Sequence, residues 1–267
     1  MENKENVKEL TAEEAAKEME KIVEEKEKEV EEREKKETIE KEEKKDRETI
    51  EKEERLGRWI PKTQLGKDVL AGKLKNIDEV LDSGRKIMED EIVDYLLNVR
   101  TELLNIGQAK GKFGGGKRRG WRQTQKKTKE GNKLTFSVMA VVGDENGHIG
   151  LGFGRASETF PAKEKAIRKA KMNLIRIRRG CASYDCLCKE SHSIPAIARG
   201  KCSSYEIILK PAPQGTGLVV GDEVKKILRL AGIKDVYGKS FGKSRTTLNV
   251  GKACIEALEN LNRMELR

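Results

Sequence analysis

The most regular pattern of apolar and polar positions lies between residues 132 and 155. Apolar side chains occupy every second position at its start: Leu134, Phe136, Val138 and Ala140. This period of two predicts a half-buried β-strand. Residues 143–147, with the sequence GDENG, predict a turn, because the two glycines can adopt positive φ angles. A second strand is predicted over residues 148–154, so the whole stretch predicts a β-hairpin.

Glycine occupies alternate positions of the second predicted strand: Gly150, Gly152 and Gly154. One face of that strand is therefore almost bare, and a backbone or a phosphate could approach it closely. Lysine and arginine residues precede and follow the hairpin, which favours an RNA-docking surface. A hairpin whose glycine-rich edge strand has only a structural role is the alternative, and the pattern alone does not separate the two.

Periodic apolar positions predict several further elements. Residues 160–179 predict one helix whose apolar stripe packs on the hairpin and whose cations face outward. Shorter helices are predicted over residues 76–83 and 86–98. The C-terminal part predicts a β-β-α-β-α domain, with strands at 193–200, 203–212 and 234–240 and helices at 221–231 and 246–262. The expected fold class is α+β.

The 267-residue chain carries a net charge of +10, and that charge is unevenly distributed. Residues 1–55 hold 15 Lys or Arg and 23 Asp or Glu, a net charge of −8, so the remaining residues carry +18. A body this basic points to a polyanion such as RNA. The first 55 residues have sparse apolar positions and no heptad pattern, which predicts a solvated helix or a disordered tail. A partner-binding arm is the alternative for this Glu/Lys-rich tail.

Composition excludes other classes of protein. No run approaches the roughly 18–20 apolar residues that a membrane-spanning helix needs, and the charged N-terminus does not resemble a signal peptide. The five cysteines are an odd number, and reduced thiols in a cytosol are the expected state.

Residues 107–130 form the most cationic part of the sequence, called here the basic segment. Glycines interrupt any helix, and no apolar period is present. Repeated cations with two aromatic residues suit phosphate contact combined with base stacking, whereas a solvated linker is the alternative. The candidate RNA-binding residues in this segment are Lys112, Lys117, Arg118, Arg119, Trp121, Arg122, Lys126 and Lys127.

The basic segment also contains a spacing that resembles a phosphate-binding loop. Gly111 and Gly116-Lys117 have the required separation, but Arg118 stands where such a loop has Ser or Thr. No predicted strand precedes the loop and no helix follows it. A nucleotide-hydrolysing enzyme is therefore not expected.

Three cysteines and one histidine lie within twelve residues of one another: Cys181, Cys186, Cys188 and His192. Three thiolates and an imidazole are a ligand set that zinc accepts in tetrahedral structural sites. Their spacing is tighter than in a standard zinc finger, and reduced, independent thiols in a loop are the alternative. One structural zinc ion is the only cofactor that the sequence suggests, and the spacing alone does not separate it from independent thiols.

Three separated stretches resemble the universal small-subunit ribosomal protein S-five family. They are the hairpin with Gly143, Gly147, Gly150 and Gly152, the stretch LKPAPQGTGLVVGDEVKKILRLAGIKDVYGKSFG over residues 209–242, and WIPKTQLGKDVLAGKLKNIDEVLDSG over residues 59–84. The last is similar to the archaeal and eukaryotic branch. The resemblance covers about residues 57–262. One departure is Asn132, where the family carries a basic residue that neighbouring Lys133 could replace.

Composition, which defines the tail and the basic segment, and this resemblance together predict a domain organisation. A tail (1–55) and a helical extension that wraps ribosomal neighbours (56–106) precede the basic segment (107–130). A double-stranded-RNA-binding-like domain with the Cys/His loop (131–192) and a C-terminal α+β domain with a left-handed crossover (193–267) follow. Further candidate RNA-binding residues are Arg155, Lys163, Arg176, Arg178, Arg179, Lys239, Lys243 and Arg245.

The resemblance implies a structural, non-catalytic protein of the small ribosomal subunit in the cytoplasm. Its expected partners are small-subunit rRNA and neighbouring ribosomal proteins, with the messenger RNA path nearby and no membrane. A position near the decoding and messenger-entry region and a contribution to translational accuracy are also implied. The alternative is a non-ribosomal double-stranded-RNA-binding protein whose acidic arm recruits a partner.

Overall fold

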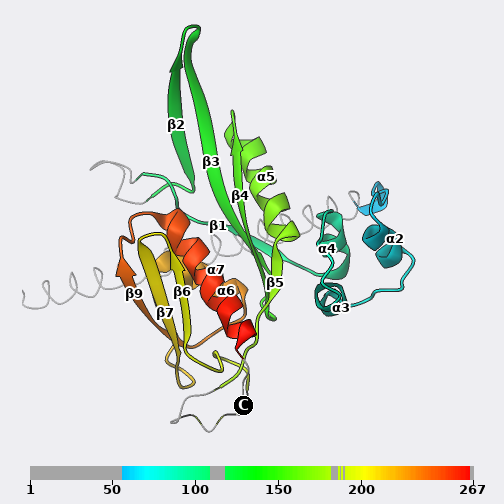
Figure 1. Cartoon of the computed structure of the whole chain (residues 1–267), viewed down its shortest axis with the longest axis vertical. Helices are drawn as coiled ribbons and strands as arrows, with labels where there is room; N and C mark the ends of the chain where they lie inside the picture. The colour runs from blue at the N-terminus through cyan, green and yellow to red at the C-terminus, as the bar shows by residue number, and fades with distance from the viewer. Residues whose placement is uncertain (1–55, 109–117, 182–185, 187, 189, 265–267) are drawn as a thin grey trace, which may run out of the picture. The chain divides into compact units, whose positions relative to one another are not determined.

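The computed structural model describes residues 56–108, 118–181, 186, 188 and 190–264 (Figure 1). The predicted tail at residues 1–55 and the candidates Lys112 and Lys117 lie outside these residues. Residues 60–267 form one unit, and the architecture below is that of the described residues of this unit. Its α+β class agrees with the prediction from the sequence.

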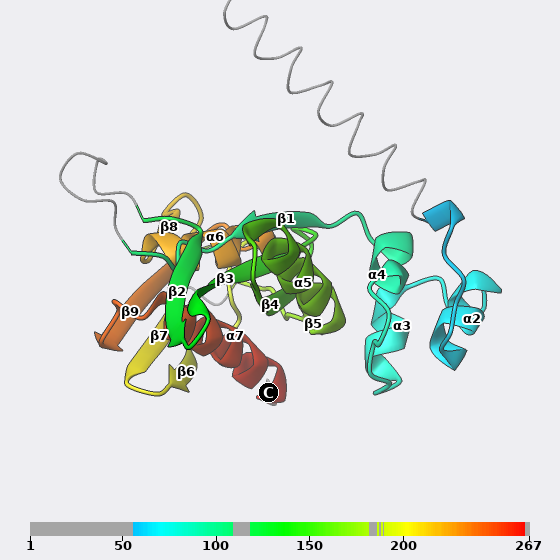
Figure 2. The same ribbon diagram turned by 90° about the horizontal axis from the view of Figure 1, so that it is seen from above.

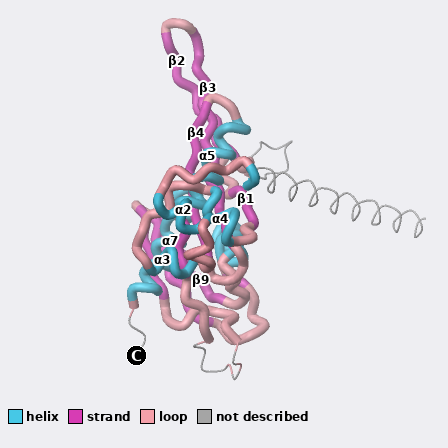
Figure 3. Tube along the Cα trace, turned by 90° about the vertical axis from the view of Figure 1, so that its right-hand side faces the viewer, coloured by secondary structure: helices cyan, strands magenta, loops and turns pink. Residues whose placement is uncertain are grey.

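The first sheet of this unit has five strands and is antiparallel throughout. It consists of β1 (Arg100–Leu103), β2 (Trp121–Thr128), β3 (Gly131–Gly143), β4 (His148–Ala156) and β5 (Leu174–Arg176). The predicted hairpin forms β3 and β4, joined by the predicted turn. Strands β1 and β2 pair with different parts of β3, and β5 pairs with β4. The far ends of β2 and β3 extend beyond β4 as a long two-stranded projection (Figures 1 and 3).

Helix α5 (Thr159–Met172) packs on one face of β3 and β4 through Ala162, Ala166 and Ala170. The predicted helix over residues 160–179 is too long at its C-terminal end. After Asn173 the chain becomes extended, and residues 174–176 pair with the beginning of β4. The apolar residues at the end of the predicted helical stripe therefore belong to a strand and the loop that follows it.

The second sheet has four strands in the order β6-β7-β9-β8. These are β6 (Ala198–Cys202), β7 (Tyr205–Pro211), β8 (Leu218–Val219) and β9 (Val236–Gly242), and only β8 and β9 are parallel. Helices α6 (Asp222–Leu230) and α7 (Thr247–Arg263) complete the domain. The predicted β-β-α-β-α order is present, with the short β8 as an addition. The first predicted strand, at 193–200, lies nearer 198–202 in the structure.

One continuous apolar core joins the two sheets. Leu104, Met139 and Ile149 from the first sheet and its border pack with Ile227 of α6 and Leu258 of α7. The same two helices cover one face of the second sheet, and they lie on one side of β6, β7 and β9 in Figure 2. The layers are therefore α5, the first sheet, α6 with α7, and the second sheet. The outer face of the second sheet is exposed.

The extension before the first sheet contains three short helices: α2 (Gln64–Leu70), α3 (Ile77–Asp82) and α4 (Glu91–Leu96). The predicted helix at 86–98 is thus much shorter. Acidic side chains of the extension reach cations of the first sheet and of α5. Asp78 contacts both His148 and Arg176, and the buried Lys171 forms an ion pair with Asp94 at 2.6 Å. None of the described helices is long and apolar enough to cross a membrane.

Candidate RNA interface and metal centre

The glycine face of β4 is covered by α5, so the expectation that Gly150, Gly152 and Gly154 meet RNA is wrong. A Cβ atom at these positions would lie 2.0–2.1 Å from carbonyl oxygens of α5. The glycines are buried, and they allow the helix backbone to approach the strand backbone directly. The bare face therefore accommodates a backbone of the same chain. On the opposite face Ile149 and Leu151 pack into the core shared with α6 and α7, so only the far end of β4, at Phe153 and Arg155, and the β2–β3 projection remain for a ligand.

Cations gather on the face of β2, β3 and β4 that is opposite to α5. Residues directly opposite one another in an antiparallel pair share a face. Arg122 pairs with Ser137, which pairs in turn with Arg155, and both arginines are exposed. Farther along the projection Lys126 lies opposite Lys133, and the two belong to the same face by strand alternation. We call Arg122, Lys126, Lys133 and Arg155 the hairpin cation face.

Residues 121–128, which the sequence assigned to an irregular basic segment, form strand β2. Lys127 lies opposite Asn132, and both belong to the other face of this hairpin. Lys133 is therefore on a different face from Asn132 and does not replace the basic residue that the family carries at position 132. Lys133 also forms an exposed ion pair with Glu130 at 3.3 Å. The guanidinium carbon of Arg119 lies 6.0 Å from the centre of the Trp121 ring, at the outer limit for a cation–π contact.

Several predicted RNA-binding arginines have partners within the protein. Arg176 forms ion pairs with Asp78 at 3.2 Å and Asp82 at 3.7 Å. Arg179 donates hydrogen bonds to the backbone oxygens of Glu145, Asn146 and Gly232, and it thereby ties the β3–β4 turn to the loop after α6. Arg118 donates a 3.4 Å hydrogen bond to the carbonyl oxygen of Arg245. Their contacts within the protein favour structural roles for Arg176 and Arg179.

The remaining predicted cations lie apart from the hairpin cation face. Lys163 is half-buried on α5, and Arg178 is exposed after β5. Lys239 is exposed on β9, and Lys243 and Arg245 are exposed in the loop that follows β9. The structure therefore distributes the predicted cations over at least two separate surfaces.

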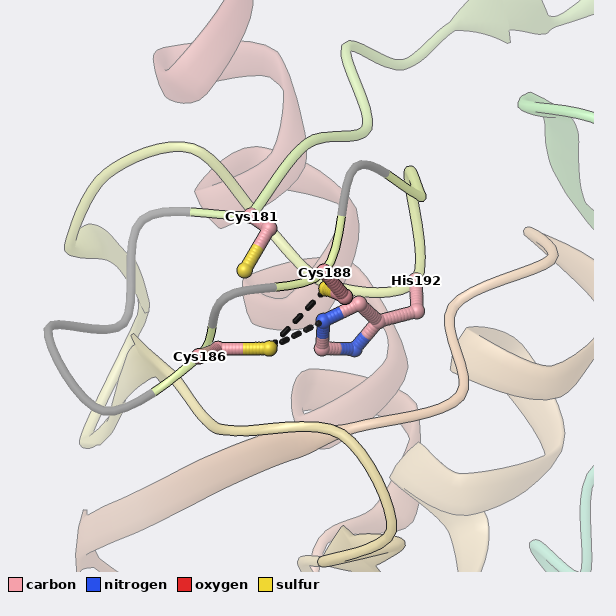
Figure 4. Close-up of side chains that lie close together, drawn as sticks. All are labelled: Cys181, Cys186, Cys188 and His192. Atoms are coloured by element: carbon pink, nitrogen blue, oxygen red, sulfur yellow. Dashed lines mark hydrogen bonds between the residues drawn. The ribbon is translucent and has the colours of Figure 1, made fainter.

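The four predicted metal ligands converge (Figure 4). The ligand atoms of Cys181, Cys186, Cys188 and His192 all lie within 4.8 Å of one another. The sulfur of Cys186 is 2.9 Å from that of Cys188 and 3.5 Å from Nε2 of His192. Three thiols and an imidazole at this separation are compatible with one tetrahedral zinc ion.

The close contact between Cys186 and Cys188 changes the acidity of both thiols. Their mutual hydrogen bond lowers the pKa of Cys186 to about 6 and raises the pKa of Cys188 to about 11. The Cys186 thiol is therefore the more acidic of the two. Thiolate is the form that binds metal, so a cluster that readily gives up a first proton suits a metal ligand set.

His192 is held in place by Asp235, a residue that the sequence analysis missed. Nδ1 of the buried His192 lies 2.7 Å from Oδ2 of Asp235, which leaves Nε2 directed at the thiols. The other carboxylate oxygen accepts a 2.7 Å hydrogen bond from the backbone of Gly217. A carboxylate that orients a ligand histidine in this way is typical of zinc sites. The 43-residue separation of His192 and Asp235 gives no local signal of their contact.

His148, the first residue of β4, has two carboxylate partners. Its Nδ1 lies 2.6 Å from Asp144 and its Nε2 lies 3.0 Å from Asp78. Burial lowers the pKa of His148, but the hydrogen bonds to Asp144 and Asp78 outweigh that effect, and the pKa is raised. The imidazole of His148 thus connects the β3–β4 turn to α3, which is a structural contact.

Two family models match the two halves of this architecture. The N-terminal domain of ribosomal protein S5 matches residues 120–178, and the C-terminal domain of ribosomal protein S5 matches residues 200–266. The small ribosomal subunit protein uS5 of Nanoarchaeum equitans is 49% identical over 210 residues, which cover 78% of this chain and 90% of that protein. Those of Staphylothermus marinus and Methanobrevibacter smithii are 45% and 43% identical, over 89% and 91% of their own lengths.

Two basic α+β domains that match ribosomal domains in the same order define a protein of the ribosomal class. The chain belongs to the ribosomal protein S5 family, and its relatives from archaea confirm the resemblance noted in the three separated stretches. The family model for the first domain begins at residue 120, immediately before β2, which agrees with β2 being part of the sheet.

Proposed function

We propose that this protein is a structural constituent of the small ribosomal subunit that binds small-subunit rRNA and has no catalytic role. The observation that carries the proposal is the identity of 43–49% with small-subunit proteins over more than three quarters of this chain. The net charge of +18 outside the first 55 residues supports a polyanionic partner. The cytoplasmic ribosome is the corresponding location.

The mechanism is electrostatic and geometric. Cations on the hairpin cation face offset the repulsion between phosphates, and the shared core of the two domains keeps their surfaces in a fixed arrangement. On the family resemblance we expect a double-stranded-RNA-binding-like first domain, a left-handed crossover in the second, and a position near the decoding and messenger-entry region. Neighbouring ribosomal proteins and translational accuracy belong to the same expectation.

The rRNA interaction is tested by measuring affinity for small-subunit rRNA as a function of salt. The triple variant Arg122→Gln, Lys126→Gln, Arg155→Gln should reduce the slope of log affinity against log salt by about 2 to 3, because each lost phosphate contact removes about 0.9. The control changes Lys67, Lys73 and Lys75, three exposed lysines of the extension, to glutamine. Equal slopes for the two variants would contradict a role for the hairpin cation face.

Assembly separates the ribosomal function from the alternative. In a sucrose gradient, the protein should sediment with the small subunit and remain there after a moderate salt wash. A pool that sediments mainly free of subunits while still binding duplex RNA would favour the non-ribosomal double-stranded-RNA-binding protein with an acidic partner-binding arm.

We also propose that Cys181, Cys186, Cys188 and His192 bind one structural zinc ion. The convergence of four ligand atoms and the Asp235 carboxylate behind His192 support this site. An ion there would connect the loop before β6 to the strand that begins after Asp235 and would add to stability by binding only the folded state. Its role would be structural, since four protein ligands leave no open position for substrate.

The zinc site is tested by elemental analysis of the purified protein and by the thiolate absorption of a cobalt-substituted sample. We expect about one equivalent of metal in the native protein and loss of the cobalt bands in Cys186→Ser. Cys202→Ser is the matched control, because this thiol lies outside the cluster. Asp235→Asn should retain the site but weaken metal affinity by about 10- to 100-fold. Native protein without bound metal that also fails to take up cobalt would exclude the site.

A further inference from the structure

The outer face of the second sheet is a separate basic and aromatic surface. Strand register places Lys210 opposite Tyr237, Ile208 opposite Lys239, and Glu206 opposite Phe241. The neighbouring strand adds Arg199 opposite Ile208 and Lys201 opposite Glu206. These positions alternate with Tyr205, Ile207 and Leu209, which are buried toward α6 and α7. The face therefore contains four cations, one carboxylate and two aromatic rings.

The two aromatic rings are exposed although they lie within a regular strand. Tyr237 is 42% exposed and Phe241 is 47% exposed, and both belong to β9. They are four residues apart, so they point to the same face about 13 Å from each other. Lys239 lies between them on that face. The rings gain nothing from this exposure in the isolated protein, because burial of an aromatic side chain is favourable.

The charge on this face selects the class of partner. None of Arg199, Lys201, Lys210 and Lys239 has an ion-pair partner among the described residues, in contrast to the paired cations near the extension. The one acidic residue of the face, Glu206 of the inner strand β7, lies between Lys201 and Phe241. Cations around separated, exposed rings match the chemistry of unpaired nucleotides, in which bases stack and phosphates need neutralisation.

We infer that the outer face of β6, β7 and β9 binds single-stranded RNA, with one base stacked on Tyr237 and another on Phe241. Lys239 contacts the phosphate backbone that joins the two bases, and Arg199, Lys201 and Lys210 extend the contact across the sheet. This inference builds on the proposed function, and it assigns to the second domain an unpaired rRNA segment, distinct from the partner of the hairpin cation face. A stacking platform of this kind tolerates different bases, because every base has an aromatic face.

The test measures binding of the full chain to a fluorescent single-stranded oligoribonucleotide of ten adenines by anisotropy. Tyr237→Ala and Phe241→Ala should each weaken binding about tenfold, because one stacking contact is removed in each. The salt slope should stay the same, since no charge is lost. Lys239→Gln should reduce that slope by about 0.7, the value for one phosphate contact with a single strand.

Phe160→Ala, which removes an exposed ring on α5, is the matched control and should leave affinity unchanged. Thermal unfolding of each variant establishes that the fold is retained, as expected for exposed positions. Unchanged affinity in the Tyr237→Ala, Phe241→Ala double variant would overturn the inference. So would an equal loss in Phe160→Ala.

Ultraviolet cross-linking within assembled small subunits separates this inference from the proposed function. If the chain assembles and the peptide containing Tyr237 cross-links to rRNA, both stand. If the chain assembles but that peptide attaches only to another ribosomal protein, the sheet face is a protein interface and the inference fails alone. If the chain neither assembles nor binds rRNA, the proposed function fails first.

Discussion

Replacing Gly152 by alanine tests the contact between α5 and the first sheet. A Cβ atom at this position would lie 2.0 Å from the carbonyl oxygen of Ala166 and 2.3 Å from the amide nitrogen of Ala170. Ordinary contact begins at 3.4 Å, so helix and strand would have to separate by more than 1 Å. The opposing atoms are helix backbone, and no side-chain rotation can relieve the overlap. We expect the free energy of unfolding to fall by about 3 kcal/mol, which is in the upper part of the usual range for overpacking.

The measurement is urea unfolding followed by circular dichroism, with thermal unfolding alongside. Gly152→Ala should lower the unfolding temperature by about 6–12 °C for a domain of this size. Gly120→Ala is the control, because its new Cβ atom would meet only the side chain of Leu103 at an ordinary 3.6 Å. That variant should change stability by less than about 0.5 kcal/mol. If both variants unfold at the same urea concentration, the close backbone approach does not limit residue size on β4, and the structural explanation of the glycines is refuted.

Two contacts of the extension give further predictions. Asp94→Asn should lower the free energy of unfolding by about 3–5 kcal/mol, because it leaves the buried Lys171 without its counter-ion. Glu259→Gln, at an exposed pair, should lower it by at most about 1 kcal/mol. Equal losses for the two variants in urea unfolding would argue against a buried pair. His148 has a raised pKa, so its contribution is complete below the ordinary value of 6.5 and is lost as the pH rises through the raised value. The stability difference between wild type and His148→Gln should therefore be larger at pH 5.5 than at pH 9, and a difference independent of pH would contradict the contact of the charged imidazole.

Elements with one buried face were predictable from the sequence, and elements without one were not. Strand β3 was predicted correctly because Val138 and Ala140 face α5, whereas the neighbouring Met139 and Val141 face the core shared with α6 and α7. Strand β2 was missed because most of its length is solvent-exposed on both faces, so polar residues stand at both odd and even positions and no alternation is visible. Its structure comes from backbone pairing with β3, a long-range interaction that leaves no apolar pattern in the sequence.

The end of α5 was missed for a different physical reason. Leu174, Ile175 and Ile177 continue the apolar spacing of the helix, but Asn173 leaves the helical conformation and residues 174–176 complete the sheet beside β4. A short apolar run is compatible with a helix and with a strand. Here the free edge of β4 favours the strand, because residues 174–176 can pair with it. The alternate glycines were ambiguous in the same way: a bare strand face accepts either a ligand or a helix backbone, and here it accepts the backbone of α5.

The convergence of the four candidate metal ligands was predictable because they are close in sequence, whereas Asp235 was not, because it reaches His192 from the loop before β9, 43 residues away. The same distinction applies to the two surfaces proposed to bind RNA. Lysine and arginine were visible in the sequence, but their availability depends on the acidic residues that fold against them.

Acidic residues of the extension explain why several of the described cations are paired within the protein. Asp78 and Asp82 engage Arg176, Asp90 engages Arg168, and Asp94 engages Lys171. These contacts neutralise positive charge at one end of α5 and around β5, where a continuous basic surface would otherwise form. On the hairpin cation face only Lys133 is paired among the described residues, through its exposed contact with Glu130, and on the outer face of the second sheet Glu206 is the one carboxylate beside four cations. If both surfaces bind RNA as proposed, the shared core between the domains would fix how far apart the two RNA segments are held.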